Sequence, residues 1–318
     1  MSKKKMQVWQ AWKSNESIDE FLAVANRKAS TFIFCQEEWE INYKFRYSKF
    51  KKLKSCDLVF GTYDKEFHHR TTTVSKYPNV RLHVWHNHWL FFSFGHSEKS
   101  SYKESKVPDA LFTCMNHAPH FHRIMMVDML EKHGLLDSNY YSWHSTDFES
   151  PYNPKYWTPS VKKLDGDYKL FEFPEEMFRS VIDLVTESQD QVPFITEKTY
   201  NAILRKKPFV VLGCPGMHAE LERQGFKLPH DVIDYSFDKE TDTLKRAEMV
   251  ALELKRLSKF DLGELQESLR ETVEFNRKHA LEVLRRQEGI PDVMKYDNYV
   301  KQLLEDIKCK LDSLESES

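Results

Sequence analysis

Three consecutive segments decide the fold class that this sequence predicts: Val181-Ile-Asp-Leu-Val-Thr-Glu-Ser188, Phe194-Ile-Thr-Glu-Lys-Thr-Tyr-Asn-Ala-Ile203 and Pro208-Phe-Val-Val-Leu-Gly-Cys-Pro-Gly216. The first and the third contain apolar runs of strand length, and the second has the spacing of a short helix that begins at Thr196. A strand, a helix and a strand in this order are typical of a parallel sheet with helices on both faces.

The same alternation continues on both sides of these segments. Strands are predicted at Thr31–Cys35, Cys56–Gly61, Arg81–Trp85, Ala110–Met115, Asn139–Trp143, Met177–Thr186, Phe209–Leu212 and Val232–Tyr235. Helices are predicted at 17–28, Phe121–His133, Thr196–Lys206, Met217–Gln224, Glu240–Leu257, Leu262–Gln287 and Asp292–Leu311. Trp89–Phe94 is a further apolar run of strand length. The sequence therefore predicts an α/β protein with a helical C-terminus.

Length and composition predict a globular chain of about two domains, since 318 residues exceed the roughly 150 that one domain uses. A hydrophobic share of 40% can fill a core. Gly95–Val107 has no apolar period and is the best linker candidate. We therefore predict domains at 1–107 and 108–288, followed by a C-terminal helix and acidic tail at 289–318.

The sequence predicts a cytoplasmic protein. No apolar run reaches the roughly 18 residues of a membrane span, and Met1-Ser-Lys-Lys-Lys5 leads into polar sequence rather than an apolar signal core. The five cysteines are odd in number and form no C-x-x-C pair, which suits a reducing compartment.

Charge is unevenly distributed along the chain. Residues 1–107 contain 19 Lys and Arg against 11 Asp and Glu, and the remaining residues contain 28 against 38. Cations and aromatic residues interleave in Tyr43–Lys54. This pattern suits either an anionic partner or a solvated amphipathic face whose aromatic residues are buried.

The segment around residue 196 carries the clearest chemical signal. Thr196 is a good N-cap, and the first turn of a helix attracts phosphate through its N–H groups and its dipole. Lys198 on that turn suits a diphosphate, and Glu197 can accept hydrogen bonds from a ribose diol. Glutamate in a first turn is also ordinary helix sequence.

A family resemblance strengthens this interpretation. Phe194-Ile-Thr-Glu-Lys198, preceded by Glu187-Ser188 and followed by Pro208-Phe-Val-Val-Leu-Gly213, resembles the donor-binding motif of the α1,3-fucosyltransferases and related GT-B glycosyltransferases. Phe112-Thr-Cys-Met-Asn-His117, His122-Arg-Ile and Leu130-Glu-Lys-His-Gly134 are similar to the family's upstream segments. The resemblance covers roughly 110–235. The chain lacks the family's asparagine after Glu187 and has phenylalanine in place of its tyrosine at position 194, which leaves the sugar and the base open.

The resemblance implies a GT-B-like fold, with two Rossmann-like domains facing a cleft, and an inverting, metal-independent transfer from a GDP-fucose-like donor to a hydroxyl acceptor. It places Arg123 and Lys198 on the diphosphate, Glu197 on the ribose and Phe194 near the base, with Thr196 in the same motif. The first domain would bind the acceptor and the second the nucleotide sugar.

An inverting reaction also needs a general base. Asp64 and Glu66 follow a predicted strand and are candidates, although acids in such a turn also simply face solvent. Glu187 is the third candidate, and it suits an orienting role better than proton abstraction.

Two histidine groups lie near these segments. His83, His86 and His88 surround a predicted strand, with His86 and His88 on one face; His117, His120 and His122 precede or begin a helix. No carboxylate or cysteine has the spacing of a shared metal site, so we predict no metal and instead place His117 or His120 near the phosphates.

Two other functions fit the same sequence. The basic first domain could receive nucleic acid, which would make the protein a DNA-base glycosyltransferase. The fold could also serve a non-catalytic interaction protein, although Arg123, Glu197 and Lys198 argue against lost chemistry.

Overall fold

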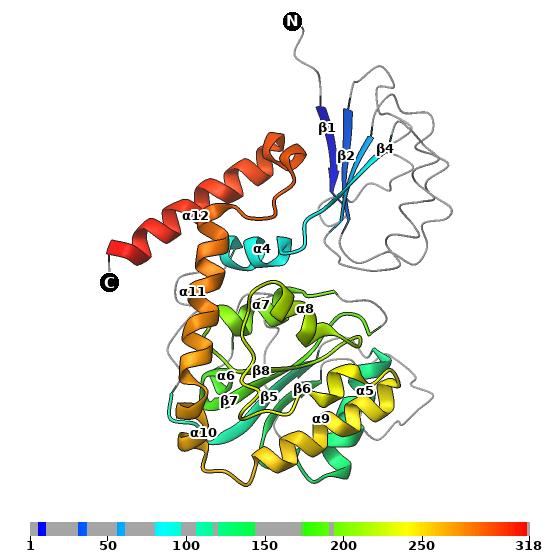
Figure 1. Ribbon diagram of the computed structural model, residues 1–318, viewed down its shortest axis with the longest axis vertical. Coiled ribbons are helices and arrows are strands. Elements are labelled where there is room, and N and C mark those ends of the chain that lie inside the picture. Colours follow the sequence, from blue (N-terminus) through cyan, green and yellow to red (C-terminus); the bar gives the residue numbers. More distant parts are fainter. Residues whose placement is uncertain are drawn as a thin grey trace, which may run out of the picture. The chain divides into compact units, whose positions relative to one another are not determined.

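The computed structural model describes residues 6–10, 31–36, 56–60, 80–96, 106–116, 120–143, 173, 175–190 and 194–316. The chain divides into two compact units. The first comprises Met1–His88 with Gln287–Asp306, and the second comprises Trp89–Arg286 with Ile307–Ser318. Each unit contains a parallel sheet of four strands (Figure 1). The assignment of acceptor binding to residues 1–107 and of donor binding to residues 108–288 stays a prediction.

The sheet of the first unit has its strands in chain order. They are β1 (Met6–Gln10), β2 (Thr31–Gln36), β3 (Cys56–Phe60) and β4 (Val80–Val84). Each strand runs parallel to its neighbour, with Met6 opposite Thr31, Phe32 opposite Cys56, and Cys56 also opposite Val80. The three strands predicted here are confirmed, whereas the helix predicted at 17–28 lies outside the described residues.

The sheet of the second unit has the order β6-β5-β7-β8, again with every pair parallel. Its strands are β5 (Ala110–Asn116), β6 (Tyr140–Trp143), β7 (Ser180–Thr186) and β8 (Phe209–Leu212). Every residue of β7 is buried, as expected for a parallel strand that is covered on both faces. The predicted α/β class is confirmed.

The order of these strands creates a switch point between β5 and β7. The chain leaves β5 toward β6 on one side and leaves β7 toward β8 on the other. The helices that follow these two strands are α5 (Phe121–Lys132) and α7 (Glu197–Leu204). Figure 1 shows α5 beside α9 on one side of the sheet and α7 beside α11 on the other. Open α/β sheets bind ligands at such points.

The remaining helices follow the predicted periodicity with shifted ends. They are α8 (Met217–Arg223), α9 (Thr243–Leu257), α10 (Leu262–Ser268) and α11 (Arg270–Arg286). Carboxylate N-caps explain two of the starts: Asp242 accepts from the N–H of Lys245 at 3.0 Å, and Asp261 accepts from that of Glu264 at 3.0 Å. The single helix predicted over Leu262–Gln287 is two helices, α10 and α11, which are separated at Leu269.

The C-terminal helix is α12 (Asn298–Ser316), preceded by the 3-10 turn η5 (Asp292–Tyr296). Val300, Leu303, Ile307 and Leu311 are buried at helical spacing, which confirms the predicted apolar stripe. Within the second unit, Lys310 Nζ donates to the carbonyls of Phe94 at 2.9 Å and Gly95 at 2.5 Å. The ammonium thus satisfies carbonyl groups in the last turn of a second helix, α4 (His88–His96).

Three strand predictions differ from the structure. Trp89–Phe94 lies within α4, because a short run that is apolar on all sides does not distinguish a strand from a buried helix. His86 and His88 consequently do not share a strand, since β4 ends at Val84. Val232–Tyr235 is a turn, in which the carbonyl of Pro229 accepts from the N–H groups of Val232 and Ile233.

The third strand prediction that differs is Met177–Thr186, whose first residues form a helix. Met177–Arg179 belongs to a short helix, α6 (Glu176–Arg179), and the strand begins only at Ser180. The N–H of Phe178 donates to the carbonyl of Glu175 at 2.9 Å, a local bond that a strand cannot contain. Phe178 in α6 and every residue of β7 are buried, so one apolar run in the sequence spans both elements.

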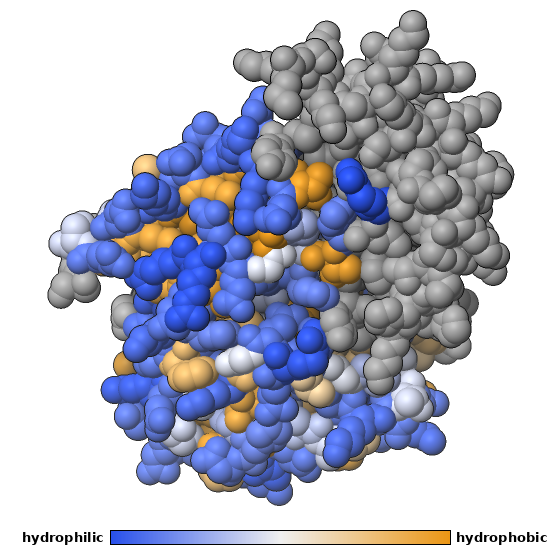
Figure 2. Space-filling model, turned by 45° about the horizontal axis from the view of Figure 1, so that its top comes forward, coloured by the Kyte–Doolittle hydropathy of each residue, from blue (hydrophilic) through white to orange (hydrophobic). Residues whose placement is uncertain are grey.

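Where Figure 2 colours the surface, most of it is polar, with apolar side chains in separate patches between the polar ones. Scattered apolar side chains are normal on a protein surface. Among the helices of the described residues, none combines the length and the apolar character that a bilayer span requires.

A buried polar cluster lies beneath α7. Asp183 in β7 pairs with Arg205 after α7, and the Phe173 ring stacks on the guanidinium at 4.1 Å. The Lys207 ammonium is 1% exposed, and within the described residues its Nζ has no hydrogen-bond partner. Burial lowers the pKa of Lys207 from 10.5 to about 8, with Arg205 acting in the same direction and Asp183 opposing.

We predict that Lys207→Met stabilises the protein at pH 7 by about 2 kcal/mol, because it removes a buried ammonium and leaves the Asp183–Arg205 pair intact. The unfolded chain holds the Lys207 proton more tightly than the folded protein does. The free energy of unfolding of the wild type therefore rises as pH increases from about 8 toward 10.5.

Urea unfolding at several pH values measures this difference. The advantage of Lys207→Met over the wild type should shrink as pH rises through this window. Lys259→Met, at an exposed position, is the control and should show no such trend. A constant difference across the window would contradict the prediction.

Candidate functional site

The candidate site lies where β5 and β7 end side by side. Thr186 at the end of β7 donates through Oγ1 to Asn116 Oδ1 at the end of β5, at 2.5 Å. The chain then passes from β5 into α5 and from β7 into α7. Two helices therefore begin near the same edge of the sheet, at its switch point.

The carboxylate of Glu187 fixes the start of α7. Glu187 is fully buried, and its Oε1 accepts from the N–H of Thr196 at 3.0 Å and from Thr199 Oγ1 at 2.6 Å. Its Oε2 accepts from Thr196 Oγ1 at 2.5 Å and from the N–H of Ser188 at 3.3 Å. These four donors compensate the burial of the carboxylate and lock the first turn of α7 to the end of β7.

The backbone of Glu187 fixes the start of α5. Its carbonyl accepts from His122 Nε2 at 2.7 Å and from Arg123 Nη2 at 3.1 Å, and both side chains are buried. Burial lowers the pKa of His122 to about 4, with the positive charge of Arg123 acting in the same direction. His122 is therefore neutral at pH 7, with its Nε2–H donating to the carbonyl.

Lys198 lies over the first turn of α7. Its Nζ donates to Glu197 Oε1 at 2.6 Å, to Ser188 Oγ at 3.1 Å and to Thr196 Oγ1 at 3.2 Å. The Lys198 side chain is 30% exposed, whereas that of Glu197 is 7% exposed. Thr196 caps the helix, as predicted, by accepting from the N–H of Lys198 at 3.4 Å.

His120 completes the group of charged and titratable side chains at this edge. Burial lowers its pKa, and the positive charges of Arg123 and Lys198 lower it further, while Asp190 opposes them. Asp190 is held from α9, where Thr243 Oγ1 donates to its Oδ2 at 3.1 Å. We call His120, Arg123, Asp190 and Lys198 the α5–α7 cluster.

This arrangement is suited to binding an anion. Arg123 and Lys198 come from two helices and contact the adjacent residues Glu187 and Ser188. Their charges act together on the same edge, where two helix starts contribute the positive ends of their dipoles. A guanidinium and an ammonium held in this way match a ligand with two phosphoryl groups.

The start of α8, which follows β8, is occupied by the protein itself. Asp238 accepts from the N–H groups of His218 at 3.0 Å and Ala219 at 3.2 Å. His218 Nδ1 contacts Asp238 at 2.8 Å, and its Nε2 accepts from the N–H of Val211 at 3.1 Å. Although burial alone would raise the pKa of Asp238, these hydrogen bonds lower it.

The structure brings Arg123, Thr196, Glu197, Lys198 and Glu187 together, as their predicted roles require. Their contacts with a ligand stay predictions. Glu187 is engaged by donors from its own motif, which gives it a positioning role. The site residues predicted from the sequence did not include His122, although its position next to Arg123 in the sequence could have identified it.

Of the predicted site residues that remain, the structure describes only Phe194. Phe194 is fully buried, as is Thr196 in the same motif, and the place of Phe194 near the base stays a prediction. Asp64, Glu66 and His117 lie outside the described residues. Among the parts of the chain that the structure describes, no three His, Cys, Asp or Glu side chains are grouped as metal ligands.

No protein-family model matches this sequence, and no curated protein matches it either. The geometry of the site is therefore what bears on its function.

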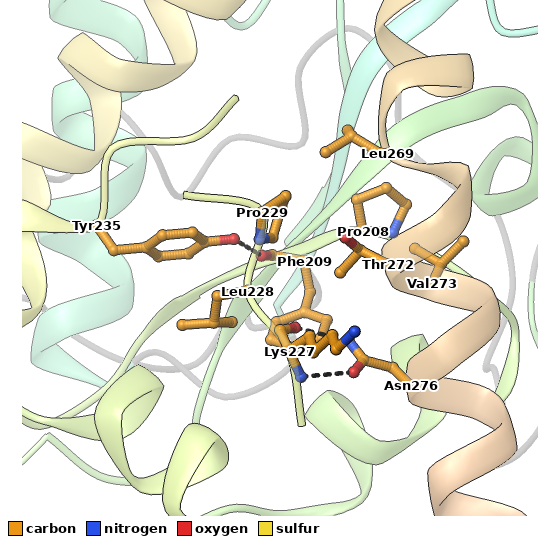
Figure 3. A pocket seen from close by; sticks show the side chains of 10 residues that line it. All are labelled: Pro208, Phe209, Lys227, Leu228, Pro229, Tyr235, Leu269, Thr272, Val273 and Asn276. Carbon is orange, nitrogen blue, oxygen red and sulfur yellow. Dashed lines mark hydrogen bonds between the residues drawn. The ribbon is translucent and has the colours of Figure 1, made fainter. Parts of the chain in front are cut away.

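A pocket lies at the opposite end of β8, between Phe209 and α11 (Figure 3). Asn276 holds the backbone of Lys227 there, accepting from its N–H at 2.7 Å and donating to its carbonyl at 2.9 Å. The Lys227 ammonium lies over the Phe275 ring at 4.1 Å, and Tyr235 Oη donates to the Phe209 carbonyl at 3.5 Å. These groups are used within the protein, and the pocket contains none of the α5–α7 cluster.

We predict that Glu187→Gln lowers the free energy of unfolding by about 2–3 kcal/mol. The amide replaces one acceptor oxygen with a donor that faces other donors in a buried site. Urea unfolding measures the loss, and faster amide exchange at Thr196 would locate it at the start of α7. Glu305→Gln, at an exposed position on α12, is the control. Wild-type stability in Glu187→Gln would contradict the positioning role.

Proposed function

We propose that this protein is a glycosyltransferase. It would move a sugar from a nucleotide-diphosphate sugar that resembles GDP-fucose to a hydroxyl of a glycan or other acceptor. One observation carries the proposal: Arg123 and Lys198 converge from two helices on the adjacent residues Glu187 and Ser188 at the switch point of the sheet. The motif that resembles the α1,3-fucosyltransferases contains three of these four residues, and its upstream segments contain Arg123.

In this proposal, each side chain binds a different part of the donor. Arg123 and Lys198 bind the diphosphate, and the carboxylate of Glu197 accepts hydrogen bonds from the ribose hydroxyls. In the free protein Lys198 pairs with Glu197 at 2.6 Å. When the donor binds, the Lys198 ammonium would contact both the diphosphate and Glu197. The pair would thereby place the ammonium at the diphosphate and the carboxylate at the ribose.

Catalysis then follows from the charge of the leaving group. As the bond between the sugar and the phosphate breaks, negative charge grows on the diphosphate and the sugar becomes oxocarbenium-like. Cations already aimed at the diphosphate stabilise this charge most strongly in the transition state. This stabilisation requires no divalent metal. In an inverting reaction, a base removes the proton of the acceptor hydroxyl as that oxygen attacks the sugar.

The proposed arrangement is of the GT-B type, with donor bound by residues 108–288 and acceptor by residues 1–107. Asp64 or Glu66 would supply the base from the first domain. Glu187 acts through the positions of α5 and α7, because its carboxylate already accepts from Thr196, Thr199 and Ser188.

Ligand binding tests the proposal directly. We expect one class among GDP-, UDP- and other nucleotide sugars to stabilise the protein by about 2.7 kcal/mol at 100 times its dissociation constant. Thermal unfolding measures the shift, and release of the nucleoside diphosphate measures slow hydrolysis of the same donor. The absence of both with every nucleotide would favour the non-catalytic interaction protein.

We predict that Arg123→Ala and Lys198→Ala each lower turnover about 100-fold or more, because each removes a cation that stabilises the leaving group. Lys259→Ala is a matched control at an exposed position and should retain turnover. Steady-state kinetics with the identified donor provide the measurement. Near-normal turnover in both cluster variants would remove these residues from the site.

Glu197→Ala should act differently. Its proposed partner is the ribose, whose hydroxyls do not change during the reaction, so the loss applies equally to ground and transition states. We expect KM for the donor to rise several-fold with kcat largely retained. A fall in kcat at unchanged KM would assign Glu197 to the chemical step instead.

A further inference from the structure

The position of His120 within the α5–α7 cluster is fixed by its backbone and by its ring. Its carbonyl accepts from the N–H groups of Arg123 at 3.0 Å and Ile124 at 3.1 Å. Its ring lies parallel to that of His122, with the planes 2° apart and the centroids separated by 6.0 Å. The His120 ring therefore lies beside His122, whose own ring donates to the carbonyl of Glu187.

The two nitrogens of the His120 ring, unlike the cations of Arg123 and Lys198, are available to bind a ligand. His120 is exposed, and within the described part of the chain neither ring nitrogen takes part in a hydrogen bond or ion pair. Arg123 and Lys198, in contrast, already donate to the protein. A ligand that reached these two cations would therefore meet an imidazole with both nitrogens available.

Charges from each surrounding element act on this ring. Arg123 and His122 come from α5, Lys198 comes from α7, and Asp190 comes from the loop between β7 and α7. Burial and the two cations outweigh Asp190 and hold the pKa of His120 below its ordinary value of 6.5. In the free protein the ring is neutral at pH 7.

We propose that His120 is a third side chain that binds the donor diphosphate, and that it does so as an imidazolium, so that donor binding takes up one proton. This inference rests on the proposed function. The proton comes from solvent, adds to the free nitrogen of the neutral imidazole and returns to solvent when the ligand leaves. No other bond is formed or broken in this step.

The charge of the ligand explains the change of protonation. The same cations that oppose protonation of His120 in the free protein attract a diphosphate. Its two negative charges then offset those cations and favour the imidazolium. By linkage, a ligand that promotes protonation binds more tightly as pH falls, over the interval between the free and bound pKa values of His120.

Calorimetric titration with GDP-fucose, GDP-mannose and UDP-glucose tests this, from about pH 5.5 to about pH 8.5. The diphosphate of a nucleotide sugar keeps two negative charges across this range, so the pH dependence belongs to the protein. For the donor that binds, we expect affinity to rise up to about tenfold per pH unit as pH falls. Titrations in buffers of different ionisation enthalpy should give an uptake of about one proton.

Three variants separate His120 from other titrating groups. His120→Gln keeps a polar side chain without the charge, and it should lose both the pH dependence and the proton uptake. His120→Lys carries a charge throughout the range and should bind with little pH dependence. His230→Gln replaces an exposed histidine that pairs with Glu222 and should behave as the wild type. Thermal unfolding without ligand checks that each variant is folded.

The outcomes are distinguishable. Donor binding without proton uptake, or full pH dependence retained in His120→Gln, would overturn the role of His120 and leave the proposed function standing. If no nucleotide sugar binds the wild type at any pH, both the proposed function and this inference are wrong. Loss of proton uptake in His120→Gln together with pH-independent binding by His120→Lys would establish the role.

Discussion

The buried Glu187 is the residue on which the arrangement of the site depends. Its N–H donates to the Leu212 carbonyl in β8 at 3.0 Å, its carbonyl accepts from His122 and Arg123 on α5, and its carboxylate holds the start of α7. A buried carboxylate is unfavourable unless donors surround it. The carboxylate of Glu187 therefore fixes the start of α7, while its carbonyl fixes the start of α5 and its N–H ties both to β8.

The same contacts hold in place the two cations that the proposed reaction uses. Arg123 and Lys198 are held by Glu187 and Ser188 before any ligand binds, so little reorganisation is needed when charge develops on a leaving group. The buried Asp183–Arg205–Lys207 cluster beneath α7 contrasts with this site. Within the described residues the Lys207 ammonium has no hydrogen-bond partner, and we expect its burial to lower stability, whereas the donors around Glu187 compensate the buried carboxylate.

Periodicity predicted much of the described fold, because a buried parallel strand and an amphipathic helix each leave a distinct pattern. It failed where the pattern was ambiguous. Trp89–Phe94 is mostly apolar and forms a helix, and Val232–Tyr235, predicted as a strand, instead begins in a turn closed by the Pro229 carbonyl. For the site, the motif around Glu197 and Lys198 identified the segment, yet it did not show that Phe194 is fully buried whereas the Lys198 side chain is partly exposed.

The sequence by itself determined the α/β class, the four strands of the second sheet and the helices α5, α7, α8 and α9 to within a few residues, and the identity of the residues around position 196. These follow from local propensity and spacing, which operate over one or two turns of chain. Only the tertiary structure decided that Arg123 lies beside Glu187, 64 positions away, and that His120 stacks on His122 in reach of the charge of Lys198. Such pairings depend on strand order and on which side chains meet the backbone of a residue far away in the sequence, and neither is encoded in the spacing of residues along one segment.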